Sequence, residues 1–176
     1  MKNNLWLWQF GGFVFAVALG TLLHFLFVWT GFLCFAPISA VNESTWEHIK
    51  ILFFPTLIFG FIQSAYFRQD CIVFWWIKLI GVLVGCISIP ILFYTVNGAF
   101  GKTPDWLNII FFFLSAGLGY FVEYLLFRKN FSLQRQFLAL GILLVIALFF
   151  FAFTLQPPRL PIFQDPLTKG YGIMKR

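Results

Sequence analysis

Five long apolar runs constrain this chain more than any other feature of its sequence. Each run has about 20 or more mostly apolar residues, the length that an α-helix needs to cross the hydrocarbon core of a bilayer. The runs therefore predict an all-α, polytopic integral membrane protein with five transmembrane helices. They cover about residues 7–33, 49–67, 72–94, 106–127 and 137–155.

The composition gives the same environment. Hydrophobic residues make up 61% of the chain and charged residues 10%, whereas a soluble domain has roughly half and a quarter. Polar side chains are therefore too few to cover an apolar core, and a lipid bilayer is the expected partner. Lys and Arg lie singly or in pairs at the edges of the runs rather than on one basic face, so nucleic-acid binding is not expected.

Polar or Gly- and Pro-containing segments separate the runs. The first run is too long for the apolar region of a cleaved signal peptide. After Leu155 the prolines of QPPRLPIFQDP exclude a continued helix. We therefore expect a bundle over residues 1–155 and a non-helical, Pro-rich tail over residues 156–176 that packs across the outer face.

The distribution of basic residues predicts the orientation, because Lys and Arg concentrate in cytoplasmic loops. Five lie on the side of the N-terminus and two lie in the loops of the other side: Lys2, Arg68, Arg128, Lys129 and Arg135 against Lys50 and Lys102. The four basic residues of the tail oppose this assignment. We expect a protein of the cell membrane with a cytoplasmic N-terminus and an extracytoplasmic C-terminus, which places the segment 41–50 and the tail on one face.

The segment VNESTWEHIK, residues 41–50, leads into the second run. Its Ser44 and Glu47 fit a capping box, in which Ser44 caps the helix and Glu47 returns to the Ser44 amide. Trp46 suits the membrane interface. The start of a helix therefore explains these three residues, but it leaves Glu43 and His48 without a role.

Four ionisable residues suggest a pocket. His24 lies within the first run, about 13 Å below its outer end, and an ionisable group at that depth normally faces the bundle interior or a watery cavity. With Glu43, Glu47 and His48 it forms a candidate ligand pocket, which Asp165 of the tail would cover. His24, Glu43 and His48 are also candidate metal ligands or proton carriers, although their spacing matches no known metal motif. A buried structural histidine is the alternative for His24.

The remaining charged residues of the runs have interfacial interpretations. Glu123 is expected to pair near Arg128 at the inner interface, and Asp70 is expected to pair beside Arg68. Lys78 is expected to extend its ammonium group to the inner face.

Two stretches resemble a known family. NESTWEHIKILFFP (42–55) and PRLPIFQDPLTKGYGI (158–173) are similar to motifs of a family of small polytopic bacterial membrane proteins catalogued as a domain of unknown function. The chain departs from the family pattern at Ala40, and at Lys169, where the family often has Gly. The resemblance implies membership only and brings no activity, substrate or cofactor.

Three functions are compatible with the sequence. The first is binding or transport of a small solute, ion or lipid by an outward-facing polar pocket. The second is a membrane-embedded hydrolase, with or without a metal. The third is a structural or accessory subunit, for which residues 41–50 only start a helix. The sequence identifies neither a cofactor nor a protein partner.

Overall fold

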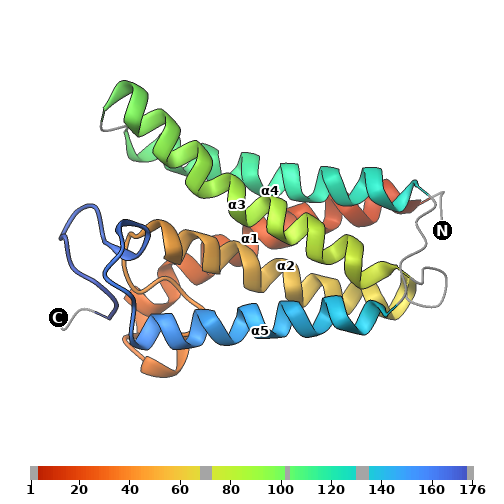
Figure 1. The fold of residues 1–176 in the computed structure, drawn as a ribbon, viewed down its shortest axis with the longest axis horizontal. Helices are drawn as coiled ribbons and strands as arrows, with labels where there is room; N and C mark the ends of the chain where they lie inside the picture. The colour runs from red at the N-terminus through yellow and green to blue at the C-terminus, as the bar shows by residue number, and fades with distance from the viewer. Residues whose placement is uncertain (1–3, 68–72, 102–103, 130–134, 174–176) are drawn as a thin grey trace.

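The computed structural model describes residues 4–67, 73–101, 104–129 and 135–173 (Figure 1). This part of the chain contains no extended strand and forms five long helices, which confirms the all-α class. All five are long and apolar enough to cross a membrane, and the protein is a multi-pass membrane protein. The helices are α1 (Leu5–Thr30), α2 (Thr45–Phe67), α3 (Phe74–Phe100), α4 (Asp105–Phe127) and α5 (Gln136–Leu155).

The five helices run along one common axis, so the described chain begins at one end of the bundle and finishes at the other (Figure 1). We call these the N-terminal end and the tail end. The tail end also holds the segment 31–44, which contains the short 3₁₀ helix η2 (Leu33–Phe35). Helix α2 lies at the centre, since 67% of its membrane-length window is buried against 22–39% for the other four helices.

The helix bounds differ from the predicted runs at the tail end. Helix α1 ends at Thr30 rather than near residue 33, because Gly31 takes the left-handed conformation (φ 66°) and its amide caps the Phe27 carbonyl. Helix α2 begins four residues before the predicted run, and α3 continues to Phe100. Hydrophobicity therefore located the spans, but capping and local hydrogen bonds set their ends.

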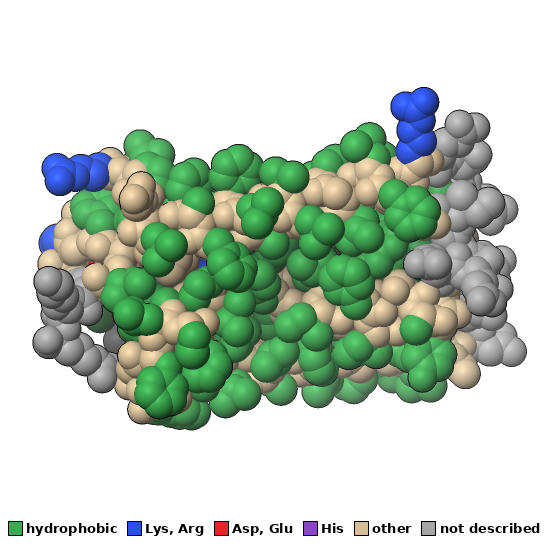
Figure 2. All heavy atoms as spheres, turned by 90° about the horizontal axis from the view of Figure 1, so that it is seen from below, with side chains coloured by type: hydrophobic (Ala, Val, Ile, Leu, Met, Phe, Trp, Pro, Cys, Tyr) green, Lys and Arg blue, Asp and Glu red, His purple; other side chains and the backbone are tan. Residues whose placement is uncertain are grey.

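The surface of the bundle is apolar along its length. Figure 2 shows hydrophobic side chains over the whole middle of one face, with the projecting Lys and Arg side chains near the two ends. Large residues such as Leu148 (67% exposed) and Trp106 (60% exposed) stand on this outer surface. A surface of this kind is stable in lipid rather than in water.

Helices α3 and α4 pack closely through glycine. A Cβ atom on Gly119 would lie 2.8 Å from the backbone oxygen of Gly81, and a Cβ on Gly85 would lie 3.1 Å from the backbone oxygen of Ser115. A methyl group at Gly119 would therefore force the helices apart, and one at Gly85 would need a shift of a few tenths of an ångström, as is usual where membrane helices approach through small residues.

The interfacial predictions for Lys78 and Glu123 are wrong. Both side chains are buried (1% and 0% exposed), and Lys78 Nζ lies 2.7 Å from Glu123 Oε2. Arg128 instead donates to the hydroxyl of Tyr124 on its own helix. Pairing inside the bundle satisfies both charges without the entropy cost of reaching the interface. The predicted Asp70–Arg68 pair lies outside the described residues.

The C-terminal tail packs on the tail end of the bundle. Its one 3₁₀ turn, η3 (Pro161–Phe163), buries Phe163 against Trp46, with ring centroids 4.6 Å apart. The Asn42 amide also donates to the carbonyl of Gly172 at 3.0 Å. Lys169 has φ 60°, a left-handed conformation that glycine adopts without steric cost, which agrees with the glycine that the resembling family often has there.

Candidate functional site

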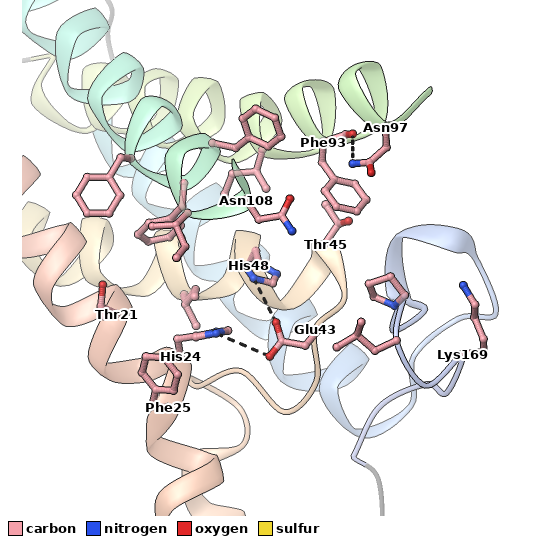
Figure 3. Close-up of a pocket in the computed structure, with 18 residues that line it drawn as sticks. Thr21, His24, Phe25, Glu43, Thr45, His48, Phe93, Asn97, Asn108 and Lys169 are labelled. Atoms are coloured by element: carbon pink, nitrogen blue, oxygen red, sulfur yellow. Dashed lines mark hydrogen bonds and ion pairs between the residues drawn. The ribbon is translucent and has the colours of Figure 1, made fainter. Parts of the chain in front are cut away.

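A cavity of about 770 Å³ opens at the tail end of the bundle. It lies between α1 and α2 on one side and the ends of α3 and α4 on the other, with the tail beside it (Figure 3). Its lining is mostly apolar and aromatic, with one concentrated group of polar residues. The lining residues are Thr21, His24, Phe25, Glu43, Thr45, His48, Ile51, Ile89, Phe93, Asn97, Asn108, Ile109, Phe111, Phe112, Phe113, Pro166, Leu167 and Lys169.

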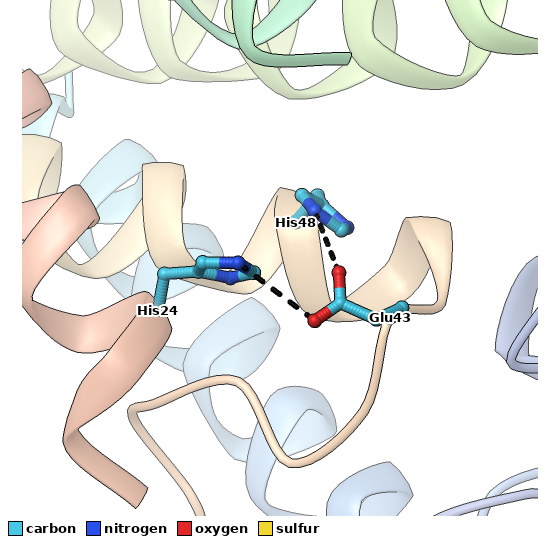
Figure 4. A group of neighbouring side chains, drawn as sticks. All are labelled: His24, Glu43 and His48. Carbon is cyan, nitrogen blue, oxygen red and sulfur yellow. Dashed lines mark ion pairs between the residues drawn. The ribbon is translucent and has the colours of Figure 1, made fainter. Parts of the chain in front are cut away.

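Three of the predicted residues, His24, Glu43 and His48, meet on one wall of this cavity (Figure 4). The two oxygens of Glu43 each face one imidazole, at 3.8 Å from His24 Nε2 and 3.8 Å from His48 Nε2. One donor atom from each residue lies within 4.8 Å of the other two. The three side chains come from α1, the 31–44 segment and α2, and we call them the triad.

Short hydrogen bonds fix the segment that carries Glu43. The Ala40 amide donates to the carbonyl of Leu23 at 3.1 Å, which holds the segment against α1 one residue from His24. On the other side of Glu43, the Ser44 amide donates to Asn42 Oδ1 at 2.9 Å. The position of the carboxylate between the two imidazoles therefore follows from backbone contacts on both sides.

The two histidines differ in how they are held. His48 Nδ1 lies 2.9 Å from the Ser44 carbonyl, and since a carbonyl only accepts, Nδ1 carries the hydrogen and Nε2 keeps its lone pair. Metal-binding histidines are commonly oriented by such a bond. His24 Nδ1 has no hydrogen-bond partner among the described residues, so its ring can take either tautomer.

The geometry suits an ion better than direct bonds within the triad. A distance of 3.8 Å is too long for a hydrogen bond, so Glu43 forms ion pairs with the imidazoles only when they are protonated, without a direct hydrogen bond. Bonds of about 2.0–2.2 Å to zinc separate neighbouring donors by roughly 3–4 Å. The described donor atoms lie up to 4.8 Å apart, so they would have to move about 1 Å closer to one another to reach a common ion.

The other two predicted pocket residues lie elsewhere. Glu47 is buried beneath the triad wall, 2.5 Å from Lys50 Nζ, and also accepts from the Val41 amide at 3.0 Å. Asp165 is buried within the tail, where its Oδ1 accepts from the Leu167 amide at 2.7 Å. Neither residue lines the cavity, so the structure brings neither of them to the open face of the triad.

The predicted capping box is half correct. The Glu47 amide donates to Ser44 Oγ at 3.4 Å, as expected for a cap. The returning half is absent, because the Glu47 carboxylate binds Lys50 and the Val41 amide and the Ser44 amide uses Asn42 instead. Trp46 packs between Phe150 and Phe163 rather than facing the membrane interface alone.

Two polar residues opposite the triad were missed by the sequence interpretation. Asn97 and Asn108 come from the ends of α3 and α4, and Figure 3 shows the Asn108 amide turned into the cavity toward His48. The available signal was an amide at the edge of a strongly apolar run, which is uncommon in a lipid-facing position. The cavity thus has polar groups on two facing walls.

Comparison with known proteins places the chain in a family without giving it an activity. The model of a family of unknown function (DUF6512) matches residues 1–173. This range contains both resembling segments and all five helices. No curated protein and no solved structure matches the chain.

Proposed function

We propose that this chain, which belongs to the family of unknown function DUF6512, is a membrane protein that binds a divalent transition-metal ion at the triad. The observation that carries the proposal is the convergence of His24, Glu43 and His48, whose donor atoms lie within 4.8 Å of one another at the cavity wall. The three residues come from separate parts of the chain, so their meeting is a property of the fold.

The donor set favours particular ions. Two imidazole nitrogens and one carboxylate suit zinc, iron, manganese or nickel, whereas calcium and magnesium prefer sites made of oxygen alone. One carboxylate also offsets half of the charge of a divalent ion. Three protein ligands leave at least one coordination position, and that position faces the cavity, where a solute or water would bind.

Binding or transport is favoured over hydrolysis. Glu43 is the single carboxylate that the described cavity lining contains, and as a metal ligand it cannot serve as a separate general base. A hydrolase of this kind would depend on metal-bound hydroxide alone. Metal-assisted hydrolysis is therefore the second candidate, supported by the open coordination position.

The orientation is part of the proposal. The five basic residues of the N-terminal end support a cytoplasmic location of that end, against Lys102 in the opposite loops, since Lys50 is buried within α2. The four basic residues of the tail oppose this assignment. The triad and the tail then lie on the extracytoplasmic side of the cell membrane. A cysteine-accessibility assay tests this directly, since Cys34 is exposed at the tail end, and membrane-impermeant reagent applied to intact cells is expected to label it.

Metal analysis of purified protein tests the site. We expect about one zinc, iron, manganese or nickel ion per chain, and an affinity on the order of 100-fold lower after Glu43→Gln or His48→Ala. Thr21→Val is the matched control, because Thr21 lines the cavity but its hydroxyl donates to the Val17 carbonyl. Unchanged metal content in the folded Glu43→Gln and His48→Ala variants, or no binding by the unmodified chain, would reject the proposal.

A further inference from the structure

We propose that the cavity binds an amphiphile with an anionic oxygen headgroup, such as a phosphate or carboxylate on an acyl or prenyl chain. The headgroup would lie between the triad and Asn108, and the chain would lie along the aromatic wall. This inference rests on the proposed metal site for part of its headgroup recognition, and it adds a ligand class that the metal site alone does not specify.

The size of the cavity is the first argument. A bound ion with two or three waters fills roughly 100 Å³, since a water occupies about 30 Å³, whereas the cavity measures about 770 Å³. Pockets for organic ligands have volumes of about 300–1,000 Å³. The space beyond the triad is therefore of the size that an organic molecule needs.

The chemistry of the walls is the second argument. Beyond the triad the cavity is lined by aromatic and branched side chains from four helices, which offer water no hydrogen bonds. A hydrocarbon chain satisfies such a wall. These apolar residues are Phe25, Ile51, Ile89, Phe93, Ile109, Phe111, Phe112 and Phe113.

The position of the cavity relative to lipid is the third argument. Phe25, Ile109 and Phe113 line the cavity and remain 42%, 59% and 43% exposed, so the cavity is open at its apolar wall. On α4, which carries the last two of these, Ile110 and Leu114 lie outside the cavity lining and are 41% and 56% exposed, so apolar surface that can face lipid adjoins the cavity wall. An amphiphile can enter from the membrane without its chain passing through water.

The polar groups define the headgroup. Asn108 points into the cavity opposite His48 (Figure 3), and its Nδ2 group is the part of the amide that can donate to an anionic oxygen. Lys169 of the tail also lines the cavity. A divalent ion, Glu43 and Lys169 together carry a net charge of +2, which attracts an anion, and the Asn108 amide supplies a hydrogen bond at the opposite wall.

Three soluble probes separate the parts of this ligand. Native mass spectrometry of the purified chain would use dihexanoyl phosphatidic acid, dihexanoyl phosphatidylcholine and inorganic phosphate, each with and without the metal. We expect one phosphatidic acid per chain, bound at least tenfold more tightly than either of the other probes. Equal binding of inorganic phosphate would show that the site takes a free anion, and equal binding of phosphatidylcholine would remove the anionic headgroup. Either result overturns the proposal.

Two variants locate the binding. Asn108→Leu and Phe113→Ser are each expected to weaken phosphatidic acid binding about tenfold. Phe149→Ser is the matched control, because Phe149 is similarly exposed (51%) but lies on α5 outside the cavity lining. If Phe149→Ser weakened binding as much as Phe113→Ser, the lipid would bind the general surface and the inference would fail.

The metal and the amphiphile can fail separately. If the chain binds no metal but binds phosphatidic acid in a way that depends on Asn108 and Phe113, the proposed metal site is rejected and the proposed amphiphile site is supported. If the chain binds metal at the triad but shows no preference for phosphatidic acid, only the proposed amphiphile site is rejected.

Discussion

Two buried Lys–Glu pairs, one near each end of the bundle, have very different surroundings. At the tail end, Lys50 Nζ contacts Glu47 Oε2, the Ala36 carbonyl and Thr154 Oγ1, the last two at 2.9 Å. Near the N-terminal end, Lys78 Nζ lies 2.7 Å from Glu123 Oε2 and 3.3 Å from Gln63 Oε1. The ring of Tyr120 lies 5.0 Å from the same ammonium group.

The difference is in how completely the polar atoms are satisfied. The Glu47 carboxylate also accepts from the Val41 amide, so the tail-end pair connects α2, the 31–44 segment and α5. In contrast, Glu123 Oε1 and Gln63 Nε2 have no partner among the described residues. The first pair therefore helps to hold the 31–44 segment, which carries Glu43, against the bundle, whereas the second joins α2, α3 and α4 and contacts no described loop segment.

The largest expected effect is the loss of Lys50. Lys50→Met removes three hydrogen-bonding contacts, leaves the Glu47 carboxylate and the Ala36 carbonyl buried without them, and is expected to lower the free energy of unfolding by about 3–5 kcal/mol. Lys78→Met is the matched variant and should cost less, because Lys78 makes two such contacts, with Glu123 and Gln63, and no backbone carbonyl is among them. Thermal unfolding of both variants in one detergent measures the difference. An equal or larger loss for Lys78→Met would contradict the comparison.

The sequence predicted the spans better than it predicted these pairs. Apolar runs of bilayer length are a local property, so the five helices followed directly from residues 7–155. Lys50 and Glu47 are three residues apart on one helix, but the Ala36 and Thr154 contacts arise only in the folded bundle. Lys78 and Glu123 are 45 residues apart, and no pattern in the sequence links them.

The residues of the candidate site were partly predictable, because some of their features are local to the sequence. His24 is unusual in an apolar run, and Glu43 and His48 are left over once the helix start is explained, so all three were singled out. Their convergence depends on the backbone hydrogen bond from the Ala40 amide to the Leu23 carbonyl, which the sequence does not reveal. Asn108 was missed because an amide near a helix end has an ordinary structural explanation, and its position opposite His48 depends on the packing of α4.

Replacing both members of each pair gives the next largest contrast. Lys78→Met with Glu123→Leu is expected to leave stability nearly unchanged or to raise it, since apolar replacement of a buried pair is often neutral or stabilising by about 1–4 kcal/mol. Lys50→Met with Glu47→Leu should remain destabilised by about 2–4 kcal/mol, because the Val41 amide and the Ala36 carbonyl each lose a partner worth roughly 1–3 kcal/mol. Unfolding midpoints of the two double variants measure this. Similar stability of the two double variants would show that the backbone groups around the tail-end pair do not depend on it for their hydrogen bonds.

Gly81 gives a way to displace Glu123 without removing its charge. A Cβ atom at Gly81 would overlap the Glu123 side chain, so Gly81→Ala must move the carboxylate or separate α3 from α4, at a cost of about 1–3 kcal/mol. Gly117→Ala on α4 is the control, since its Cβ would lie at an ordinary 3.7 Å from Phe13 and should be neutral or slightly stabilising. The two unfolding midpoints would be compared in the same detergent. A tolerated Gly81→Ala would mean that Glu123 has a second position of similar energy.

The smallest effect comes from removing one neutral partner of each ammonium group. Thr154→Val deletes the hydroxyl that accepts from Lys50 at 2.9 Å and is fully buried, so it should cost about 1 kcal/mol. Gln63→Leu deletes a longer contact of 3.3 Å together with an amide nitrogen that has no described partner. The lost hydrogen bond and the removed desolvation cost then nearly cancel, and the expected change is close to zero. If Gln63→Leu proved as costly as Thr154→Val, the amide nitrogen of Gln63 would have to form a hydrogen bond in the membrane. The two pairs would then differ in geometry but not in how fully their polar atoms are hydrogen-bonded.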